Sequence, residues 1–497
     1  MRPWAQIRET HSGVVVLLGD HAFKLKKPVD LGFLDFTTRE ARRAVCLEEV
    51  ELNRRLAPDV YEGVADVLGP DGELCEHLVV MRRMPEERRL SVLVRSGQPV
   101  EAHLRQVARM VASMHSRTRH GPQIDEQGGR EALWSRWTAS LNQVRALPDV
   151  ILGIEVLQEI ERLTLRFLDG REHLFAARVE EGRIVDGHGD LLAEDIFCLD
   201  DGPRILDCLE FDERLRFLDG LDDAAFLAMD LERLGAPQPG EMFLNWYAEF
   251  SGDPSPPSLW HHYVAYRAFV RAKVACLRHC QGDSDAVREA RELAKLTVRH
   301  LRAGAVQLIL VGGPPGTGKS TLAAAVADRL GHTLLSSDRV RKELAGIAPG
   351  QPAPAPFGEG LYHREHTERT YRELLSRAGR LLRHGEPVVL DASWIDAGHR
   401  AAAEEVARNT SSDLVALRCT ASPRVVAERL AFRTGGISDA DQAIAATMAE
   451  RAAPWPDAVE IDTGTSPEQS LERALAAIHP PPGTAARRFR RPRMEPG

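Results

Sequence analysis

The segment Gly313-Pro314-Pro315-Gly316-Thr317-Gly318-Lys319-Ser320 constrains the fold of this 497-residue chain more than any other feature. It matches the pattern G-x-x-x-x-G-K-[ST] in full, after the apolar run 307–311 and before the helix-like run 321–330. Glycines in such a loop let backbone N–H groups converge on phosphate oxygens, and the following helix N-terminus adds positive potential. The segment therefore predicts a phosphate-binding loop between a strand and a helix.

This loop predicts an ATP site that uses Mg²⁺. Lys319 would reach the terminal phosphates, and the Ser320 hydroxyl would be a magnesium ligand. A chance glycine turn is the alternative, which the flanking strand and helix disfavour. The predicted nucleotide-binding residues are Gly313, Pro314, Pro315, Gly316, Thr317, Gly318, Lys319, Ser320 and Thr321.

The region after residue 305 alternates apolar runs with helical patterns. Strands are expected at 307–311, 333–336, 387–390, 414–418 and 459–462. Strands that alternate with helices favour a parallel sheet with helices on both faces. We expect a P-loop domain at 305–480, with a Pro/Gly/Ala-rich excursion at 348–360. The basic segment 481–497 is expected to be a disordered, solvated tail, with a nucleic-acid or membrane role as the less favoured alternative.

Two carboxylates are candidates for chemistry beside the loop. Asp391 ends the apolar run Val388–Leu390, where a P-loop enzyme holds its magnesium shell, although a buried strand can also end in an incidental Asp. Asp338 follows the strand 333–336 and would face the phosphates across the crevice at the strand ends. It is a candidate base for a substrate hydroxyl, and Arg341 could hold a substrate anion. A helix N-cap with a surface Arg is the alternative.

Arginines line the helical run after 414–418. Arg424, Arg429 and Arg433 lie there, and Arg429 and Arg433 are four residues apart on one helix face. They could form a catalytic lid that neutralises a transferring phosphoryl group, or they could simply be a solvated helix face.

The first 300 residues predict a second kind of unit. Residues 1–85 indicate strands around one helix, with a hairpin at 14–26 and the helix at 39–56. A short strand is expected at 78–81. Residues 86–300 are mostly helical in pattern, interrupted by a strand-and-loop segment at 185–212 and by a loop at 251–258.

The interruption at 185–212 contains His188-Gly189-Asp190 and, seventeen residues after Asp190, Asp207. Asp190 in a glycine-flexed loop suits a base that accepts a hydroxyl proton, and a hairpin could return Asp207 to a Mg²⁺ ion. His188 is expected to organise the backbone. Upstream, the strand residue Lys24 and the helix residue Glu49 suit a pair that positions ATP phosphates. A structural His-Gly turn with surface acids is the alternative for this set.

Together these motifs resemble two families fused in one bacterial chain. Residues 305–480 resemble the small P-loop kinases (gluconate kinase, polynucleotide kinase and zeta toxin), and Asp338 with Arg341 looks like the substrate pair of polynucleotide kinase. Residues 1–300 are similar to aminoglycoside phosphotransferase-like kinases. Such fusions are often described as AAA family ATPases. The segments that carry the N-terminal resemblance are Glu9–Ser12, Lys24–Pro28, Gly32–Phe36, Asn53–Pro58 and Met81–Pro85.

The resemblance implies a bilobal N-terminal fold, with lobes at 1–85 and 86–300. It also implies an adenine-reading hinge at Met81–Pro85 and a second magnesium ligand at position 195, where the broader kinase pattern has Asn. Here Asp195 stands instead and adds negative charge beside the phosphates. Lys24 and Lys26 share one strand face, and Lys24 is the expected phosphate ligand because two apolar-leaning residues precede it.

Composition narrows the function classes. The formal net charge is −9, which gives no broad positive field for a nucleic acid and argues against a polynucleotide substrate. Seven cysteines without a C-x-x-C pair favour a reducing cytoplasm, and the Cys276–Cys280 pair with its neighbouring histidines favours buried helix residues over a metal. No apolar run is long enough for a membrane span.

The expected activity is phosphoryl transfer from ATP to a small hydroxyl-bearing acceptor. An ATP-sensing regulator and a kinase for a macromolecule are the alternatives. The sequence indicates neither the acceptor nor the oligomeric state.

Overall fold

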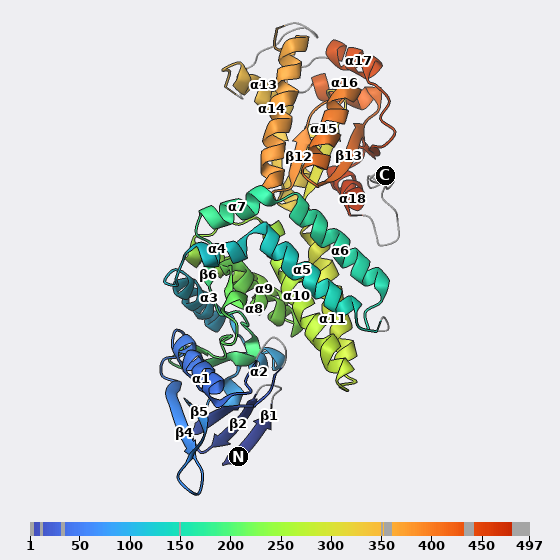
Figure 1. Ribbon diagram of the computed structural model, residues 1–497. Helices are drawn as coiled ribbons and strands as arrows, with labels where there is room; N and C mark the ends of the chain where they lie inside the picture. Colours follow the sequence, from blue (N-terminus) through green and yellow to red (C-terminus); the bar gives the residue numbers. More distant parts are fainter. Residues whose placement is uncertain are drawn as a thin grey trace, which may run out of the picture. The chain divides into compact units, whose positions relative to one another are not determined.

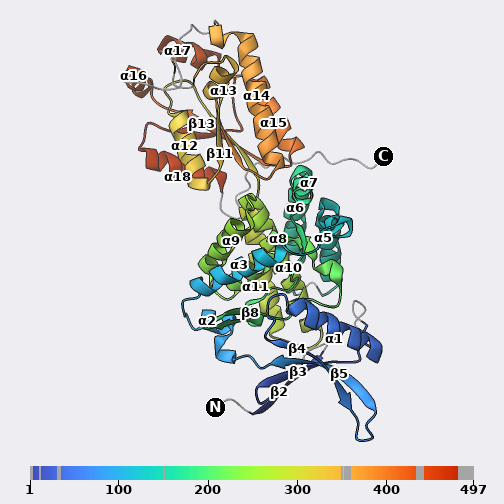
Figure 2. The ribbon, with the colours of Figure 1, turned by 90° about the vertical axis from the view of Figure 1, so that its left-hand side faces the viewer.

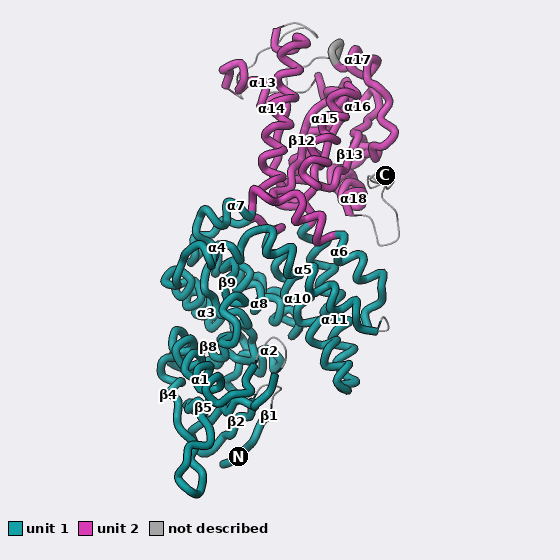
Figure 3. Tube along the Cα trace, in the orientation of Figure 1, with its two compact units in different colours: residues 1–162, 175–255, 259–304 teal, residues 163–174, 256–258, 305–497 magenta. Residues whose placement is uncertain are grey.

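The computed structural model of the protein describes residues 4–9, 13–30, 35–148, 151–348, 351, 360–431 and 442–479. The chain divides into two compact units (Figure 3). Unit 1 comprises residues 1–162, 175–255 and 259–304, and unit 2 comprises residues 163–174, 256–258 and 305–497. Most of the predicted excursion at 348–360, Arg433 and the basic tail lie outside the described residues.

Unit 1 begins with a five-stranded antiparallel sheet of order β1-β2-β3-β5-β4 (Figure 1). The predicted hairpin is confirmed, because β2 pairs with β3 from Gly13↔Lys26 to Leu18↔His21. The strand expected at 78–81 is part of a longer β5. The strands are β1 (Ala5–Glu9), β2 (Gly13–Leu18), β3 (His21–Lys26), β4 (Tyr61–Leu68) and β5 (Leu74–Arg82).

One helix, α1 (Arg39–Asn53), packs on this sheet against β4 and β5. Thr38 caps it by accepting a hydrogen bond from the Ala41 N–H at 3.2 Å. Its apolar face, with Cys46 and Val50, joins the core of this lobe. The helix ends three residues before the predicted Leu56, at Asn53. The Asn53 side chain donates to the Glu49 carbonyl at 2.8 Å and accepts from the Cys208 N–H at 2.9 Å, which ties the end of α1 to a later segment of unit 1.

The rest of unit 1 is mainly helical, as predicted, and two small antiparallel sheets interrupt it: β6 with β9, and β7 with β8. None of the helices in the described ranges is long and apolar enough to cross a membrane. The elements are η1 (Glu86–Arg88), α2 (Leu90–Arg95), α3 (Glu101–His115), α4 (Pro122–Gly128), α5 (Arg130–Arg145), α6 (Ile154–Asp169), α7 (Glu172–Glu180), β6 (Ile184–Asp186), η2 (Ala193–Asp195), β7 (Ile196–Leu199), β8 (Gly202–Ile205), η3 (Glu213–Leu215), β9 (Phe217–Asp219), α8 (Gly220–Arg233), α9 (Pro237–Ser251), α10 (Pro257–Cys280) and α11 (Ala286–Ala303).

Unit 2 contains a five-stranded, wholly parallel sheet of order β11-β12-β10-β13-β14. All five predicted strands are present within one or two residues of their expected ends. The elements are β10 (Gln307–Gly312), α12 (Lys319–Leu330), β11 (Thr333–Ser336), α13 (Ser337–Leu344), η4 (Gly360–Tyr362), α14 (Arg364–Arg383), β12 (Val388–Asp391), α15 (Ala397–Asn409), β13 (Asp413–Thr420), α16 (Pro423–Ala431), α17 (Gln442–Arg451), β14 (Val459–Asp462) and α18 (Pro467–Ile478).

Helices cover both faces of this sheet (Figure 2). Helices α12 and α18 bury Leu322, Val326 and Ile478 against one face, and α14 and α15 cover the other. The central strand β10 is buried along its whole length, which explains its near-continuous apolar sequence. The predicted doubly covered parallel sheet is therefore confirmed, and the strand ends that carry the phosphate loop lie at its centre.

Unit 2 also takes in the segment 163–174, from the end of α6 and the start of α7. Arg166 Nη2 donates to the Ser412 carbonyl at 2.7 Å, and Arg166 Nη1 pairs with Asp413 at 2.8 Å. The buried Arg171 donates to the Thr410 carbonyl at 2.6 Å. These bonds hold the loop that leads into β13, so residues 305–480 alone lack part of their own unit.

Candidate nucleotide-binding and phosphoryl-transfer sites

The phosphate loop connects β10 to α12 in the manner that the motif predicts. Gly313, Gly316 and Gly318 have φ values of 141°, 82° and 79°, and a Cβ at Gly313 would lie 2.8 Å from the Cys419 carbonyl oxygen. Only glycine tolerates both a positive φ and a backbone oxygen this close to the position of a Cβ atom. Gly318 precedes the helix without a side-chain cap. The first N–H groups of α12 are therefore free of side-chain caps and suit an anion.

Hydrogen bonds within the protein fix the loop. Thr317 Oγ1 donates to the Pro314 carbonyl at 2.7 Å, and Thr463 Oγ1 donates to the Thr317 carbonyl at 2.5 Å. The Gly313 N–H donates to the Ser393 carbonyl at 3.1 Å. A loop held this way keeps its shape before any ligand arrives, which reduces the entropy cost of binding.

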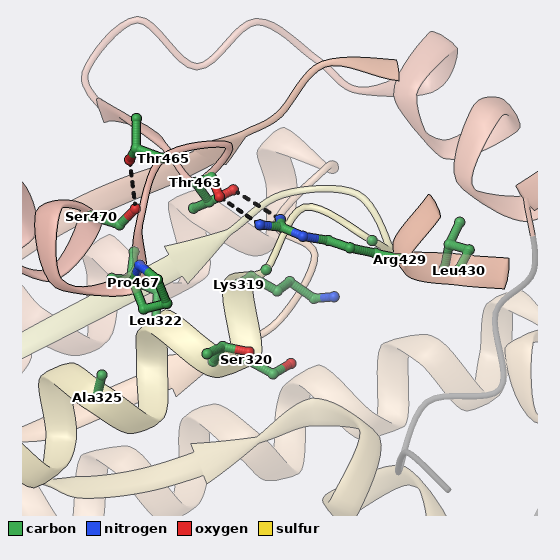
Figure 4. A pocket seen from close by; sticks show the side chains of 13 residues that line it. Lys319, Ser320, Leu322, Ala325, Arg429, Leu430, Thr463, Thr465, Pro467 and Ser470 are labelled. Carbon is green, nitrogen blue, oxygen red and sulfur yellow. Dashed lines mark hydrogen bonds between the residues drawn. The ribbon is translucent and has the colours of Figure 1, made fainter. Parts of the chain in front are cut away.

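A cavity of about 430 Å³ lies over the loop (Figure 4). The predicted lid residue Arg429 reaches across it and donates from Nη2 to the Thr463 carbonyl at 2.6 Å. The lining includes five of the predicted nucleotide-binding residues: Gly316, Gly318, Lys319, Ser320 and Thr321. Pro315 lies instead in a neighbouring cavity. Arg424 is 88% exposed and pairs with Glu428, so it lies apart from the loop, and Arg433 is outside the described residues.

Asp391 lies at the end of β12, directly beside the last residues of β10. It is 7% exposed, and its Oδ1 atom has no hydrogen-bond partner in the described structure. Burial raises the pKa of Asp391, while Lys319 and the hydroxyls of Ser320 and Ser336 act in the opposite direction. An orphaned buried carboxylate oxygen next to a lysine and a serine hydroxyl suits a hard divalent cation, so these residues fit Mg²⁺.

The second cavity of unit 2 has a volume of about 680 Å³ and begins at Pro315 and Lys319. The predicted pair lies in it: Arg341 Nη1 donates to Asp338 Oδ1 at 2.7 Å. Lys319 lines both cavities. A phosphate held at Lys319 would therefore face Asp338 from the other side.

Sequence reasoning missed an aromatic cluster at this second cavity, in which Tyr371 and His399 line the cavity and Trp394 packs on Tyr371. Tyr371, on α14, accepts from the Trp394 N–H at 3.3 Å and lies 3.1 Å from Ser393 Oγ. The His399 ring stacks on the Tyr371 ring with centroids 3.8 Å apart. Trp394 is buried with φ of 52°, a strained value for a bulky side chain. Since these residues are brought together from α14, α15 and the loop after β12, no local sequence signal marks them.

In unit 1, the strand lysine and the helix glutamate meet as predicted. Lys24 Nζ lies 2.8 Å from Glu49 Oε1 and 2.5 Å from Asp207 Oδ1. Burial alone would lower the pKa of Lys24, but Asp207, Glu49 and Glu210 outweigh it and hold that pKa well above its usual value. The hairpin β7–β8 returns Asp207 to this place, and Asp207 has φ of 63°. The Lys24 ammonium group therefore lies between Glu49 of helix α1 and Asp207, the candidate metal ligand.

Lys26 pairs with the same glutamate from the same strand face. Its Nζ lies 2.7 Å from Glu49 Oε2 and also pairs with Glu210. Lys26 is 2% exposed, whereas the Lys24 side chain is 15% exposed. The more accessible Lys24, in contact with Asp207, is the better placed of the two for a phosphate.

Lys26→Met is expected to destabilise unit 1 by about 3–5 kcal/mol, because it leaves Glu49 and Glu210 buried beside a single ammonium group. Lys27→Met is the matched control. Lys27 pairs with Glu9, whose side chain is 70% exposed, so little change is expected there. Urea denaturation of the full chain followed by circular dichroism measures both. Equal denaturation midpoints for the two variants would contradict this assignment of Lys26.

The loop His188-Gly189-Asp190 is fixed by Asp223, a residue on α8 that sequence reasoning missed. Its carboxylate accepts from the His188 N–H at 2.7 Å and the Gly189 N–H at 2.9 Å. It also lies 2.9 Å from His115 Nε2. A carboxylate that holds two successive backbone N–H groups orients the loop, and the His188 side chain lies 3.1 Å from the Leu206 carbonyl, near the strand that leads to Asp207. No local sequence signal marks Asp223, because Asp222 and Asp230 are acidic residues of the same helix.

Three carboxylates of this loop region influence one another. Burial raises the pKa of Asp190 to about 6, with Arg271 acting against it and Asp207 adding to it. Burial, then Asp207 and Asp190, raise the pKa of Asp195 well above its usual value. Across the described ranges, no three His, Cys, Asp or Glu side chains are arranged to hold a metal by themselves. Mg²⁺ bound through one or two carboxylates and the phosphates of a nucleotide remains compatible with Asp195 and Asp207.

Comparisons with known proteins find a family model, several relatives and several solved structures that are similar to this chain. A family model described as an AAA domain matches residues 308–455. The uncharacterized proteins Rv2004c of Mycobacterium tuberculosis and Mb2027c of Mycobacterium bovis are each 46% identical to this chain over 474 residues, which is 95% of this chain and of theirs. This chain belongs to the family of these mycobacterial proteins.

Two solved structures are similar to one part of the chain each. A choline/ethanolamine kinase family protein from Mesorhizobium loti is 14% identical with a TM-score of 0.39, covering 61% of this chain and 92% of its own. A gluconokinase from Sinorhizobium meliloti is 20% identical with a TM-score of 0.26, covering 35% of this chain and 91% of its own. This chain combines an N-terminal unit built from an antiparallel sheet and helices with a C-terminal unit on a parallel sheet, and the AAA-domain model matches residues of the second.

Proposed function

We propose that this protein is an ATP-dependent phosphotransferase whose unit 2 moves the γ-phosphate of ATP to a hydroxyl of a small acceptor. The position of Lys319 carries the proposal, because this residue lines both the cavity over the phosphate loop and the cavity that holds Asp338. A donor and an acceptor bound in the two cavities would meet at this lysine. Two substrate cavities joined at a phosphate-binding residue suit transfer between bound molecules.

The residues of unit 2 have separate parts in this reaction. The backbone of Gly313–Gly318 and the side chains of Lys319 and Arg429 neutralise charge on the phosphates. The acceptor oxygen forms a bond to the γ-phosphorus as the bond to the β-phosphate oxygen breaks, and ADP leaves. The hydroxyl proton goes to the carboxylate of Asp338. Ser320 and Asp391 would hold Mg²⁺, which when bound supplies charge neutralisation at the phosphates.

Unit 1 is proposed as a second nucleotide site. Lys24, held by Glu49, would contact the phosphates of ATP, and Asp195 and Asp207 would hold Mg²⁺. Asp190 would accept the proton of a second acceptor. The contacts of Lys24 with Glu49 and Asp207 support this assignment.

Unit 1 could alternatively bind the nucleotide without turnover, and the carboxylates around Asp195 favour this second function. Burial, Asp207 and Asp190 raise the pKa of Asp195, so an ionised Asp195 would be a further negative charge among carboxylates that oppose the approach of ATP phosphates unless cations are present. Unit 1 would then bind the nucleotide and regulate unit 2 without turnover. Transfer measured in the Lys319→Ala variant separates the two, because any acceptor phosphorylation that remains there belongs to unit 1.

The direct test of the proposed activity is incubation of the full chain with Mg-ATP and a small-molecule extract of the source cells, followed by mass spectrometry. We expect a species heavier by one phosphoryl group, formed together with ADP and missing in Lys319→Ala. ATP that is neither consumed nor transferred would contradict the proposal.

A further inference from the structure

We infer that Glu210 is a positioning residue of unit 1, which acts through Lys26 to hold Asp207 where a complex of Mg²⁺ and nucleotide would bind. This inference rests on the proposed nucleotide site of unit 1, which gives no part to Glu210. It comes from a line of ion pairs that joins strand β3, helix α1 and the segment after β8.

Five charged side chains of alternating sign form this line. Lys24 Nζ lies 2.5 Å from Asp207 Oδ1 and 2.8 Å from Glu49 Oε1. Lys26 Nζ lies 2.7 Å from Glu49 Oε2 and also pairs with Glu210. Glu49 therefore faces both lysines, one with each carboxylate oxygen. Asp207 and Glu210 are three residues apart, so the line begins and ends on one short segment of the chain.

The two ends of the line differ in exposure. The Asp207 side chain is 49% exposed, whereas the Glu210 side chain is 10% exposed and Lys26 is buried. Lys26 Nζ also lies 5.8 Å from the centroid of the buried Phe36 ring. Asp207 is thus open to a ligand, and Glu210 is largely closed to one. The best-attested use of a buried ion pair is to fix the register of the elements that it joins.

The backbone of Asp207 needs such support. Its φ of 63° lies in the left-handed region, which costs free energy for a residue other than glycine. The Asp207 N–H donates to Tyr61 Oη at 3.3 Å, and the Cys208 N–H donates to Asn53 Oδ1 at 2.9 Å. These bonds hold the first half of the segment, and the pair with Lys26 holds its end at Glu210. A segment fixed at several points can keep an unfavourable φ.

The pair of Asp207 with Lys24 cannot give this support in the occupied site. Asp207 Oδ1 faces the Lys24 ammonium group, but the proposed site needs that oxygen for Mg²⁺ and the ammonium group for the phosphates. The pair of Glu210 with Lys26 involves neither group, so it can persist when the nucleotide is bound. Lys26 also occupies Glu49 Oε2, which leaves Oε1 to orient Lys24.

The test uses the full chain with Lys319→Ala, so that only the proposed site of unit 1 binds nucleotide. A non-hydrolysable fluorescent ATP analogue is kept at a fixed concentration while Mg²⁺ is titrated. We expect Glu210→Gln to raise the Mg²⁺ concentration at half-maximal binding by about 10- to 100-fold, as for other residues that orient a metal ligand. Binding of the analogue without Mg²⁺ should be unchanged.

Glu213→Gln is the matched control, because Glu213 is exposed, lies three positions further along and loses the same charge. It should leave the Mg²⁺ requirement unchanged. Equal Mg²⁺ requirements for Glu210→Gln and Glu213→Gln would overturn the inference and leave the proposed nucleotide site standing. No binding of the analogue by the Lys319→Ala chain at any Mg²⁺ concentration would overturn the proposed site, and the inference with it.

Glu210→Asp separates position from charge, and it decides the question if Glu210→Gln does not fold. Aspartate keeps the negative charge but is one methylene shorter, so it cannot reach Lys26 as glutamate does. We expect a raised Mg²⁺ requirement, smaller than that of Glu210→Gln. A requirement equal to that of the parent chain would overturn the inference, because charge alone would then suffice.

Urea denaturation followed by circular dichroism measures the stability of the same variants. A lower denaturation midpoint together with a raised Mg²⁺ requirement supports the inference. A lower midpoint of Glu210→Gln with an unchanged Mg²⁺ requirement would overturn it, because a purely structural role of Glu210 predicts that result.

Discussion

Lys319→Ala is expected to reduce magnesium-dependent ATP turnover by unit 2 by about two to three orders of magnitude. The Lys319 side chain lines both cavities and forms no hydrogen bond or ion pair within the part of the chain that the structure describes. Its loss therefore removes positive charge from the phosphates and leaves the packing of α12 unchanged. Coupled-enzyme measurement of ADP release, with circular dichroism to check folding, measures both effects.

Lys295→Ala is the control for this variant, since Lys295 is 73% exposed and pairs with Glu292 on the surface of α11. The full chain is needed because Leu163–Leu174 belongs to unit 2. Turnover in Lys319→Ala equal to that of the Lys295→Ala control would mean that the phosphate loop is not the catalytic nucleotide site.

Asp338→Asn is expected to lower phosphoryl transfer by roughly two to four orders of magnitude while ATP affinity stays nearly unchanged. Asparagine keeps the size of the side chain and a hydrogen-bond acceptor for Arg341, but it cannot take up the proton of the acceptor hydroxyl. Asp338 lies in the second cavity and does not line the cavity over the phosphate loop. Single-turnover transfer and equilibrium binding of an ATP analogue separate the two quantities.

Asp328→Asn provides the comparison, because Asp328 is an exposed residue of α12 outside both cavities. A large loss of ATP affinity in Asp338→Asn, without a specific loss of transfer, would instead make Asp338 part of the magnesium shell or a helix-capping residue.

The sequence predicts those parts of the site whose residues lie close together in the chain or at the end of one strand. The phosphate loop needs glycines at fixed spacing between a strand and a helix, and the parallel sheet brings the end of β12 beside β10, so Asp391 follows from its strand. The hairpin that returns Asp207 to Lys24 could also be inferred from a short spacing.

The remaining parts depend on long-range packing. Asp223 binds the loop of His188 from a helix 35 residues away, and Tyr371 stacks on His399 from another helix. The segment Leu163–Leu174 belongs to unit 2, and its arginine side chains donate hydrogen bonds to backbone carbonyl groups of that unit. Because every loop has backbone carbonyl groups, the sequence does not indicate these partners. Helix α1 ends at Asn53 and not at Leu56 because the N–H groups of Arg55 and Leu56 bond three residues back, in turns that the helical sequence pattern does not mark.

We propose that one chain holds two nucleotide sites that bind phosphates differently: through a backbone loop in unit 2, and through the side chains Lys24 and Asp207 in unit 1. Titration of the full chain with a non-hydrolysable ATP analogue and Mg²⁺ in a calorimeter tests it most directly. We expect two sites per chain, of which Lys319→Ala removes one and Asp207→Ala weakens the other. Asp195→Asn should preserve both, since an amide oxygen can still hold Mg²⁺ and asparagine adds no charge beside the phosphates. A single site that vanishes completely in Lys319→Ala would contradict the account, because unit 1 would then be a kinase-like fold that binds no nucleotide.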